Sequence, residues 1–158
     1  GIGERVGNTP MDLLLVNLRL LGAIDQDLSL LSEYCLTVSC ATKVPIPVNY
    51  PLVGSDAFRT ATGVHAAAII KAKRKGDDWL ADRIYSGIPA GMFGMSQRIE
   101  IGPMSGQSNV AHWLEVHGHA PDPALVEFVF GHCKRADRTL GESEITALIT
   151  SYPGSPTS

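Results

Sequence analysis

Apolar residues recur every three or four positions along several segments of the chain, which is the spacing of an amphipathic helix. Residues 51–70 show it most clearly, and a helix is predicted there around the apolar positions Ala57, Ala61, Val64, Ala68 and Ile69. The same spacing predicts further helices from Met11 to about Leu21, Leu28 to Ala41, Asn109 to about Val116, Pro123 to about Ala136, and Glu142 to Ile149. The pattern therefore indicates a mainly helical chain.

Residues that favour helix starts precede three of the predicted helices. Thr9 and Pro10 are expected to be the N-cap and the first residue of the first helix. Asp122 and Pro123 are expected to have the same roles in the fifth helix, and Asp27 is a plausible N-cap of the second.

Proline and glycine mark the irregular segments between the helices. The three prolines within Lys43–Pro51 predict an extended linker that runs to Val53. The segment Ser86–Met95 is predicted to be a loop, Arg98–Ile101 a short strand and Gly102–Ser108 a turn. The chain is therefore expected to be mainly α with a small β component, and to end in a frayed tail from Tyr152.

Bulk properties exclude several classes of protein. The 158 residues, 44% of them hydrophobic, allow one ordinary domain with a core. A net charge of -3 gives no electrostatic footprint for binding nucleic acid. No apolar run approaches the ~18 residues of a membrane span, and no signal peptide is expected. Cys35, Cys40 and Cys133 lack C-x-x-C spacing and are expected to be reduced thiols of a cytoplasmic protein.

His65 is the main candidate for chemistry. It is flanked by small residues, Gly63 on one side and residues 66–68 on the other, so a backbone or a substrate could approach it closely. An imidazole transfers protons near neutral pH. The alternative is a helical histidine with one ring nitrogen bonded to a backbone carbonyl, and the spacing alone favours this alternative.

Three other groups of polar residues each have a structural interpretation beside a functional one. The basic run Lys71–Lys75 is expected to be a solvated cap at a helix C-terminus, with a contact to an acidic group such as a cofactor phosphate as the alternative. Tyr85 is expected to be a packed ring with a solvated hydroxyl. His117 and His119 have the H-x-H spacing of metal ligands but lack a suitably spaced carboxylate or thiol, so a polar helix end is expected there.

Three blocks of sequence carry recognisable motifs. Residues 1–8 are GIGERVGN, residues 51–65 contain Pro-Leu-Val-Gly, Ala-Phe and Thr-Gly-Val-His, and residues 99–106 are IEIGPMSG. In this order they resemble the N-G-x-G-E-R-x-G-N, AFxHxSGIHxDG and LGKHSGRHA motifs of the 2-isopropylmalate synthase and homocitrate synthase family. The chain departs from these motifs by lacking the first Asn and by carrying Arg59 for the first His, Thr62 for Ser, and different residues at 66–68 and 107–109.

The resemblance implies a division of the chain. Residues 1–44 would be the last strand-loop-helix of a TIM barrel, the catalytic domain. Residues 45–95 would be a linker and a first post-barrel subdomain carrying His65 and Tyr85, and residues 96–150 a second helical subdomain. Residues 151–158 would be a flexible tail.

The resemblance also implies an activity and its site. The family condenses acetyl-CoA with a 2-oxo acid, so His65 and Tyr85 are expected to be catalytic groups that handle protons. Glu4 is expected beside the substrate pocket, and Asn8 at or beside a divalent metal (zinc, magnesium or manganese). The main metal ligands of the family lie on earlier strands, so this chain alone is not expected to hold the metal.

Partners and substrate are implied more coarsely. The rest of the TIM barrel, in the same or a separate polypeptide, and a second copy that exchanges this region in a homodimer are the expected partners. The favoured 2-oxo acid is 2-oxoisovalerate, as in leucine biosynthesis, with homocitrate or citramalate synthesis as alternatives. A non-catalytic dimerisation or interaction subunit of a split synthase is the competing interpretation, and an acyl-CoA-binding module that uses Lys71–Lys75 is a third. The chain is expected to be inactive alone.

Overall fold

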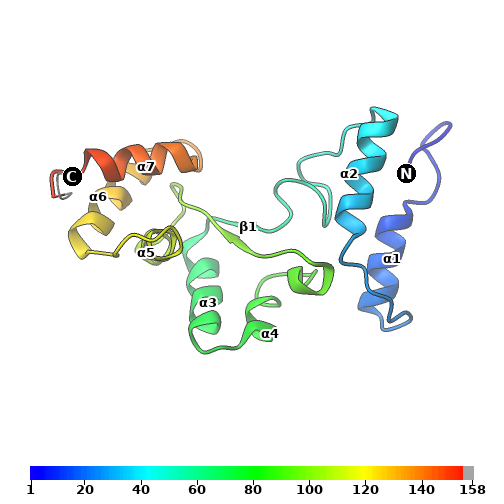
Figure 1. The fold of residues 1–158 in the computed structure, drawn as a ribbon, viewed down its shortest axis with the longest axis horizontal. Helices are drawn as coiled ribbons and strands as arrows, with labels where there is room; N and C mark the ends of the chain where they lie inside the picture. Colours follow the sequence, from blue (N-terminus) through cyan, green and yellow to red (C-terminus); the bar gives the residue numbers. More distant parts are fainter. Residues whose placement is uncertain (155–158) are drawn as a thin grey trace. The chain divides into compact units, whose positions relative to one another are not determined.

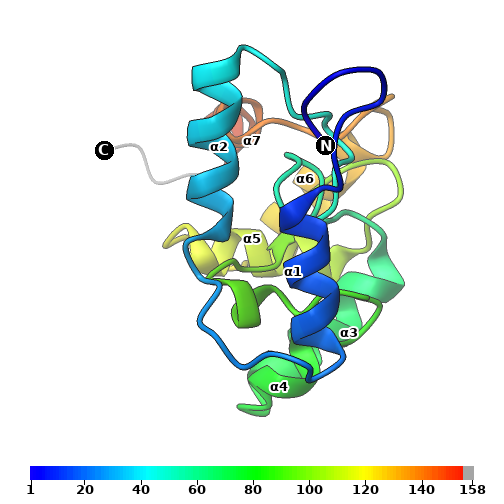
Figure 2. The ribbon, with the colours of Figure 1, turned by 90° about the vertical axis from the view of Figure 1, so that its right-hand side faces the viewer.

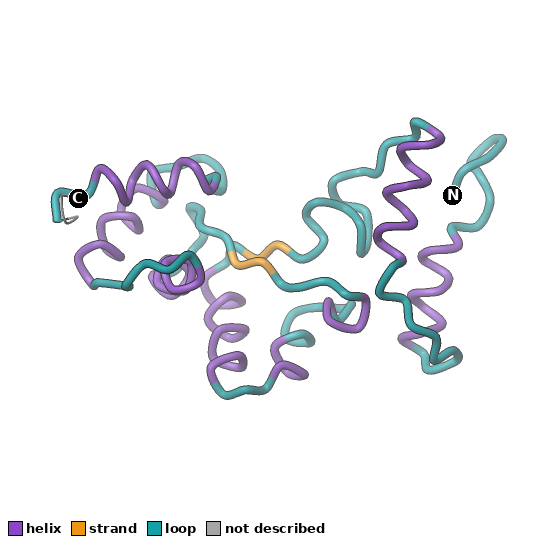
Figure 3. The backbone as a smooth tube through the Cα atoms, viewed as in Figure 1, coloured by secondary structure: helices purple, strands orange, loops and turns teal. Residues whose placement is uncertain are grey.

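The computed structural model describes residues 1–154, and in that range the chain is mainly helical with one short pair of strands (Figures 1 and 3). The helices are α1 (Met11–Leu20), α2 (Leu31–Thr42), α3 (Gly63–Arg74), α4 (Asp78–Ala81), the 3-10 helix η1 (Ala90–Phe93), α5 (Gln107–Val116), α6 (Pro123–Cys133) and α7 (Glu142–Ser151), and the strands are β1 (Arg59–Thr60) and β2 (Arg98–Ile99). The predicted mainly α character with a small β component is confirmed.

The chain folds into two compact units. Unit 1 consists of residues 1–58 and 86–97, and unit 2 of residues 59–85 and residues from 98 onward. The polypeptide therefore leaves unit 1 at β1, returns to it before η1, and leaves it again at β2. Each unit buries its own apolar side chains.

The core of unit 1 gathers apolar side chains from α1, α2, η1 and the turns near residue 52. Figures 1 and 2 show α1 and α2 beside each other. Its buried members are Val16, Leu28, Leu31, Leu52, Phe58, Ala90 and Phe93. The prediction that Lys43–Val53 is an extended linker is wrong at its end, because Leu52 is only 2% exposed. The backbone turns back here, with the N–H of Gly54 donating to the carbonyl of Tyr50 at 2.9 Å.

Two helix starts in unit 1 also differ from the prediction. Pro10 rather than Thr9 is the N-cap of α1, because its ψ of 106° is extended and excludes it from the first helical turn. Asp27 does not cap α2, which begins later at Leu31. Its carboxylate instead accepts hydrogen bonds from the backbone N–H and the hydroxyl of Ser29, at 2.9 and 3.1 Å, and closes a turn ahead of the helix.

Unit 2 combines the strand pair with helices α3 to α7. The strands are parallel, with Arg59 opposite Arg98 and Thr60 opposite Ile99. The larger core cluster packs α5, α6 and α7 together, and its buried members are Ile101, Val110, Trp113, Leu114, Leu125, Val126, Val129, Cys133, Ile145 and Ile149. A smaller cluster, Ile69, Ala72 and Ala81, joins α3 to α4.

The helix predicted within residues 51–70 begins later than its apolar spacing indicates. Ala57 lies in a turn, Thr60 belongs to β1, and α3 starts at Gly63. The carbonyl of Thr60 accepts a hydrogen bond from the N–H of Glu100 at 2.9 Å, so the backbone here bonds to the neighbouring strand instead of forming a helical turn. Val64 is 70% exposed and does not join the apolar face.

Near the C-terminus, the predicted helix start is confirmed and the predicted tail begins too early. Asp122 is the N-cap of α6, and its carboxylate accepts from the N–H groups of Ala124 and Leu125. Tyr152 was predicted to be frayed, but its ring packs against Phe128 with centroids 5.3 Å apart. Residues 155–158 of the predicted tail lie outside the described residues.

Asp12 of α1 links two titratable groups in unit 1. Burial raises the pKa of the Cys35 thiol to about 11, helped by the charge of Asp12 and a hydrogen bond to it. Burial and a hydrogen bond to Asp12 likewise raise the pKa of Tyr50 to about 12. Both groups are therefore uncharged at neutral pH, and the stability that they contribute is present below their ordinary pKa values and is lost as the pH rises through the raised ones.

Thiol alkylation should report this environment. At pH 8 we expect iodoacetamide to label Cys35 about 10-fold or more slowly than the exposed Cys40 of the same helix, because only the thiolate reacts. Asp12→Asn should reduce the difference between the labelling rates of Cys35 and Cys40, because it removes the charge that opposes formation of the Cys35 thiolate. Peptide mass spectrometry measures both rates, with urea-unfolded protein as the control in which the rates converge. Equal rates in the folded protein would contradict this assignment.

Candidate functional site

The candidate site is built where the two strands of unit 2 pass into helices. β1 leads into α3, and β2 leads through a turn at residues 102–106 into α5 (Figure 1). The two connections leave the same end of the parallel pair, because parallel strands run in the same direction. The start of α3 therefore lies beside the turn that precedes α5, and the N–H of Gly63 donates to the carbonyl of Met104 at 2.9 Å.

Two buried polar side chains hold these connections together. The Ser105 hydroxyl donates to the carbonyl of Ala61 at 2.7 Å and accepts from the N–H of Gly102 at 2.9 Å. The Asn109 amide donates to the carbonyls of Ala61 and Glu100, at 3.1 and 2.9 Å, and accepts from the N–H of Gly106 at 3.1 Å. Ser105 is 2% exposed and Asn109 is 0% exposed, so these bonds are sheltered from water.

Gly63 allows the close approach of the two backbones. A Cβ atom at Gly63 would lie 2.7 Å from the nitrogen of Gly106 and 3.1 Å from its Cα, which is too close for any side chain. The glycine ahead of His65 is thus required by packing. The backbone that approaches this small residue is that of Gly106. Ser105 and Gly106 belong to the turn that packs against the start of α3 and have a structural role there.

The structure brings the two predicted catalytic residues together. His65 lies in the first turn of α3, and its ring stacks on that of Tyr85 with centroids 4.0 Å apart and planes inclined by 26°. Tyr85 follows α4 with a φ of 56°, a left-handed conformation that is unfavourable for a residue with a side chain. Tyr85 is 66% exposed and His65 is half-buried, so the pair lies at the surface of unit 2.

Arg59 of β1 is part of the framework. Its guanidinium makes a bidentate ion pair with the carboxylate of Glu100, the residue that follows β2, and donates to the hydroxyl of Thr139 at 3.1 Å. Both charged side chains are partly sheltered, and paired charges of this geometry fix the register of the elements that carry them. The arginine thus ties β1 to β2 and to the segment before α7.

The basic run lies at the C-terminal end of α3, as the interpretation of it as a helix cap predicts. Lys71, Lys73 and Arg74 form the last turn, and Arg74 pairs with Glu115 of α5 at 2.9 Å. Burial lowers the pKa of His112 on α5, and the charge of Lys73 lowers it further. The cations therefore lie where they complement the carbonyl end of the helix dipole.

Glu4 and Asn8 lie in unit 1, in the loop ahead of α1. The Glu4 carboxylate is almost fully exposed and is 3.9 Å from the guanidinium of Arg5, a surface pair worth little energy. The Asn8 amide donates to the carbonyl of Ile2 at 3.2 Å and closes the loop. Both side chains are at the surface.

The remaining histidines of interest lie at the end of α5. His117 is the C-cap of α5, and its ring stacks on Trp113 with centroids 3.7 Å apart. Its Nε2 is 3.8 Å from a carboxylate oxygen of Glu142, and its Nδ1 is 2.7 Å from the carbonyl of Trp113. Within residues 1–154, no three His, Cys, Asp or Glu side chains gather so that they could hold a metal ion. The described residues therefore do not fit a complete metal site.

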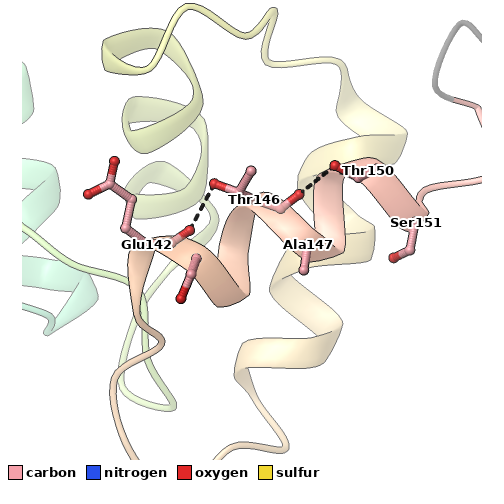
Figure 4. A pocket seen from close by; sticks show the side chains of 6 residues that line it. Glu142, Thr146, Ala147, Thr150 and Ser151 are labelled. Atoms are coloured by element: carbon pink, nitrogen blue, oxygen red, sulfur yellow. Dashed lines mark hydrogen bonds between the residues drawn. The ribbon is translucent and has the colours of Figure 1, made fainter. Parts of the chain in front are cut away.

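A shallow depression on the outer face of α7 carries no chemistry of its own. It is lined by Glu142, Ser143, Thr146, Ala147, Thr150 and Ser151 (Figure 4). The hydroxyl of Thr146 donates to the carbonyl of Glu142, and that of Thr150 to the carbonyl of Thr146, both at 2.9 Å. These donors are engaged within the helix and do not project toward a ligand.

Sequence reasoning missed Asn109, which was assigned only as the start of a helix. An Asn three residues after a Gly at a helix start is a local capping signal, and it could have indicated the bond to the N–H of Gly106. No local signal indicates its two bonds to Ala61 and Glu100, because they depend on the strand pairing.

Comparison with known proteins shows the family. An (R)-citramalate synthase of Aquifex aeolicus is 32% identical over 131 residues, which cover 80% of this chain and 23% of that protein. A protein named probable 2-isopropylmalate synthase from Ignicoccus hospitalis is 33% identical over 137 residues, 85% of this chain and 32% of its own length. A homocitrate synthase of Methanopyrus kandleri is 32% identical over 136 residues, again 85% of this chain and 32% of its own length.

These relatives are synthases of one kind, and this chain belongs to their family, the 2-isopropylmalate, homocitrate and citramalate synthases. It corresponds to a C-terminal part of such a synthase and spans less than a third of the length of the curated relatives named above. No protein-family model matches the chain. No helix in the described part of the chain is long and apolar enough to cross a membrane.

Replacement of Gly63 should test the close approach that places α3. We expect Gly63→Ala to lower the free energy of unfolding by about 1–3 kcal/mol, because the added methyl group must push the Gly106 backbone away. Gly131→Ala is the matched control, since its Cβ in α6 would meet only the end of the Arg135 side chain at 3.8 Å. It should be neutral or stabilising by less than about 1 kcal/mol. Urea denaturation measures both, and equal stability of the two variants would refute the packing role.

Proposed function

We propose that this chain is the end of the barrel and the post-barrel part of a synthase that condenses acetyl-CoA with a 2-oxo acid, and that His65 and Tyr85 act in its proton transfers. The observation that carries the proposal is the stacking of these two rings, 4.0 Å apart, at the surface of unit 2. Membership of the synthase family supports it. The two residues were named from the resemblance, twenty positions apart in the sequence, and the fold places them in contact.

The chemistry needs groups that can both take and give a proton. A base removes a proton from the methyl carbon of acetyl-CoA, the resulting carbanion attacks the ketone carbon of the 2-oxo acid, and the alkoxide formed there takes up a proton. Hydrolysis of the thioester then releases CoA. An imidazole is suited to such transfers near neutral pH. In this proposal His65 and the Tyr85 hydroxyl share the transfers, and the half-buried His65 ring is kept in one orientation by the stack.

Two residues of unit 1 are proposed to have roles in the synthase as well. The proposal puts Glu4 beside the substrate pocket and Asn8 at or beside a divalent metal, whose ligands are supplied by residues outside this chain. Zinc, magnesium and manganese are the candidate metals, and their role in such chemistry is to polarise the ketone. The exposure of both side chains supports this placement, because they can be reached by another part of the synthase.

The proposed 2-oxo acid is 2-oxoisovalerate, which would give 2-isopropylmalate in leucine biosynthesis. The relatives include citramalate, 2-isopropylmalate and homocitrate synthases at 32–33% identity, so all three substrates belong in the test. The chain alone is proposed to be inactive, and the active form to be a cytoplasmic homodimer in which this region is exchanged between subunits.

A second candidate function is a non-catalytic dimerisation or interaction subunit of a split synthase. Met11, Leu14 and Leu21 favour it, because α1 and its C-cap expose these apolar side chains at the spacing of one helix face. The two functions differ in what they require of His65, which would be dispensable in an interaction subunit.

Activity of the synthase that contains this chain separates them. CoA release is measured with pyruvate, 2-oxoisovalerate and 2-oxoglutarate in turn. We expect His65→Ala to lower kcat by about 10²–10⁴-fold, the usual contribution of a general acid or base, and Tyr85→Phe to lower it less. His132→Gln is the control, because this histidine of α6 packs on Phe128 away from the stack. Full activity of His65→Ala would refute the catalytic proposal and favour the interaction subunit.

A further inference from the structure

Asn109 is a buried polar side chain of unit 2 that makes three hydrogen bonds to the backbone. Both hydrogens of its amide nitrogen are used, one on the carbonyl of Ala61 and one on that of Glu100, and its oxygen accepts from Gly106. The side chain is 0% exposed.

The bond to Ala61 acts on the backbone that presents His65. Ala61 lies between β1 and α3, two residues before Gly63 and four before His65. The N-cap residue Thr62 makes no side-chain hydrogen bond to the helix, so α3 is not fixed at its start by its own cap. The hydrogen bonds at this point come from the connection between β2 and α5. Ser105 and Asn109 donate to the carbonyl of Ala61, and the N–H of Gly63 donates to the carbonyl of Met104.

We propose that Asn109 is a positioning residue, which orients His65 against Tyr85 by fixing the backbone at Ala61. Without the amide, the start of α3 would keep Ser105 and Met104 as partners but lose one of its anchors, and the N–H of Gly106 would lose its acceptor. The first turn of α3 could then shift, and the His65 ring with it. Asn109 touches neither His65 nor a substrate in this scheme, and its effect passes through the backbone.

The test must separate positioning from stability. Asn109→Ala and Asn109→Asp are compared with Val110→Ala. Val110 is the matched control, because it is the next residue of α5, is also 0% exposed, and belongs to the apolar cluster instead of the polar network. Asn109→Asp keeps the size and the acceptor for Gly106 but removes both donors, so it should behave like Asn109→Ala in its effect on His65.

The first readout is the NMR shift of the His65 ring protons in the folded chain. The ring of Tyr85 changes the chemical shift of the His65 ring protons that stack on it, and the Tyr85→Leu variant supplies the chemical shift of the unstacked ring as a reference. Both Asn109 variants should move the His65 resonance toward the reference, whereas Val110→Ala should leave it at the wild-type position even if it melts at a lower temperature. The proposal is overturned if folded Asn109→Ala keeps the wild-type shift, or if Val110→Ala moves it equally.

The second readout rests on the proposed function of His65. In the synthase that contains this chain, Asn109→Ala should lower kcat about 10-fold while KM changes less than about 2-fold, because a misplaced catalytic group slows the chemical step. Val110→Ala should leave kcat unchanged below its melting temperature. Full activity of His65→Ala would remove the catalytic role of the histidine, and the NMR comparison would still decide whether Asn109 positions it. A wild-type kcat in Asn109→Ala, with His65→Ala inactive, would overturn the positioning role.

Discussion

The carbonyls of Ala61 and Glu100 impose the constraint on which unit 2 depends. Each follows a strand of only two residues, too short to pair these carbonyls within a sheet. A buried carbonyl without a partner costs about 1–3 kcal/mol, so the fold must bring donors to it. Asn109 supplies a donor to both, and Ser105 donates to Ala61. These hydrogen bonds hold together the ends of the two short strands, where the connections to α3 and α5 begin.

The functional consequence is a rigid backbone beneath exposed side chains. Gly63 packs directly against Gly106 at the start of α3, while the rings of His65 and Tyr85 remain at the surface. The left-handed conformation of Tyr85 costs about 1–2 kcal/mol, and strain of this kind is often kept where a side chain must point in one direction. The proposed proton-transfer pair of His65 and Tyr85 would need this combination of order and access.

What the sequence predicted well depends on local signals. The Asp122-Pro123 start of α6 and its apolar spacing lie within a dozen residues, and the helix was found. The strand pair joins residues 59–60 to 98–99, and two-residue strands leave no periodic pattern. Because Thr60 is paired in a strand, the helix predicted within residues 51–70 cannot extend back to it. The same pairing brings the carbonyls of Ala61 and Glu100 to Asn109, so neither feature could be predicted from the spacing of apolar residues. The contact of His65 with Tyr85 is equally non-local, and only the resemblance to the family named both residues.

The most direct test of a role within a synthase is the mass of the protein purified from the cells that make it, measured under native and then denaturing conditions. We predict that this sequence is found in a polypeptide well above 16.9 kDa, or in a stable complex with a second polypeptide, that carries the metal-binding barrel. A 16.9 kDa species that pairs only with itself would contradict that role and leave an interaction module.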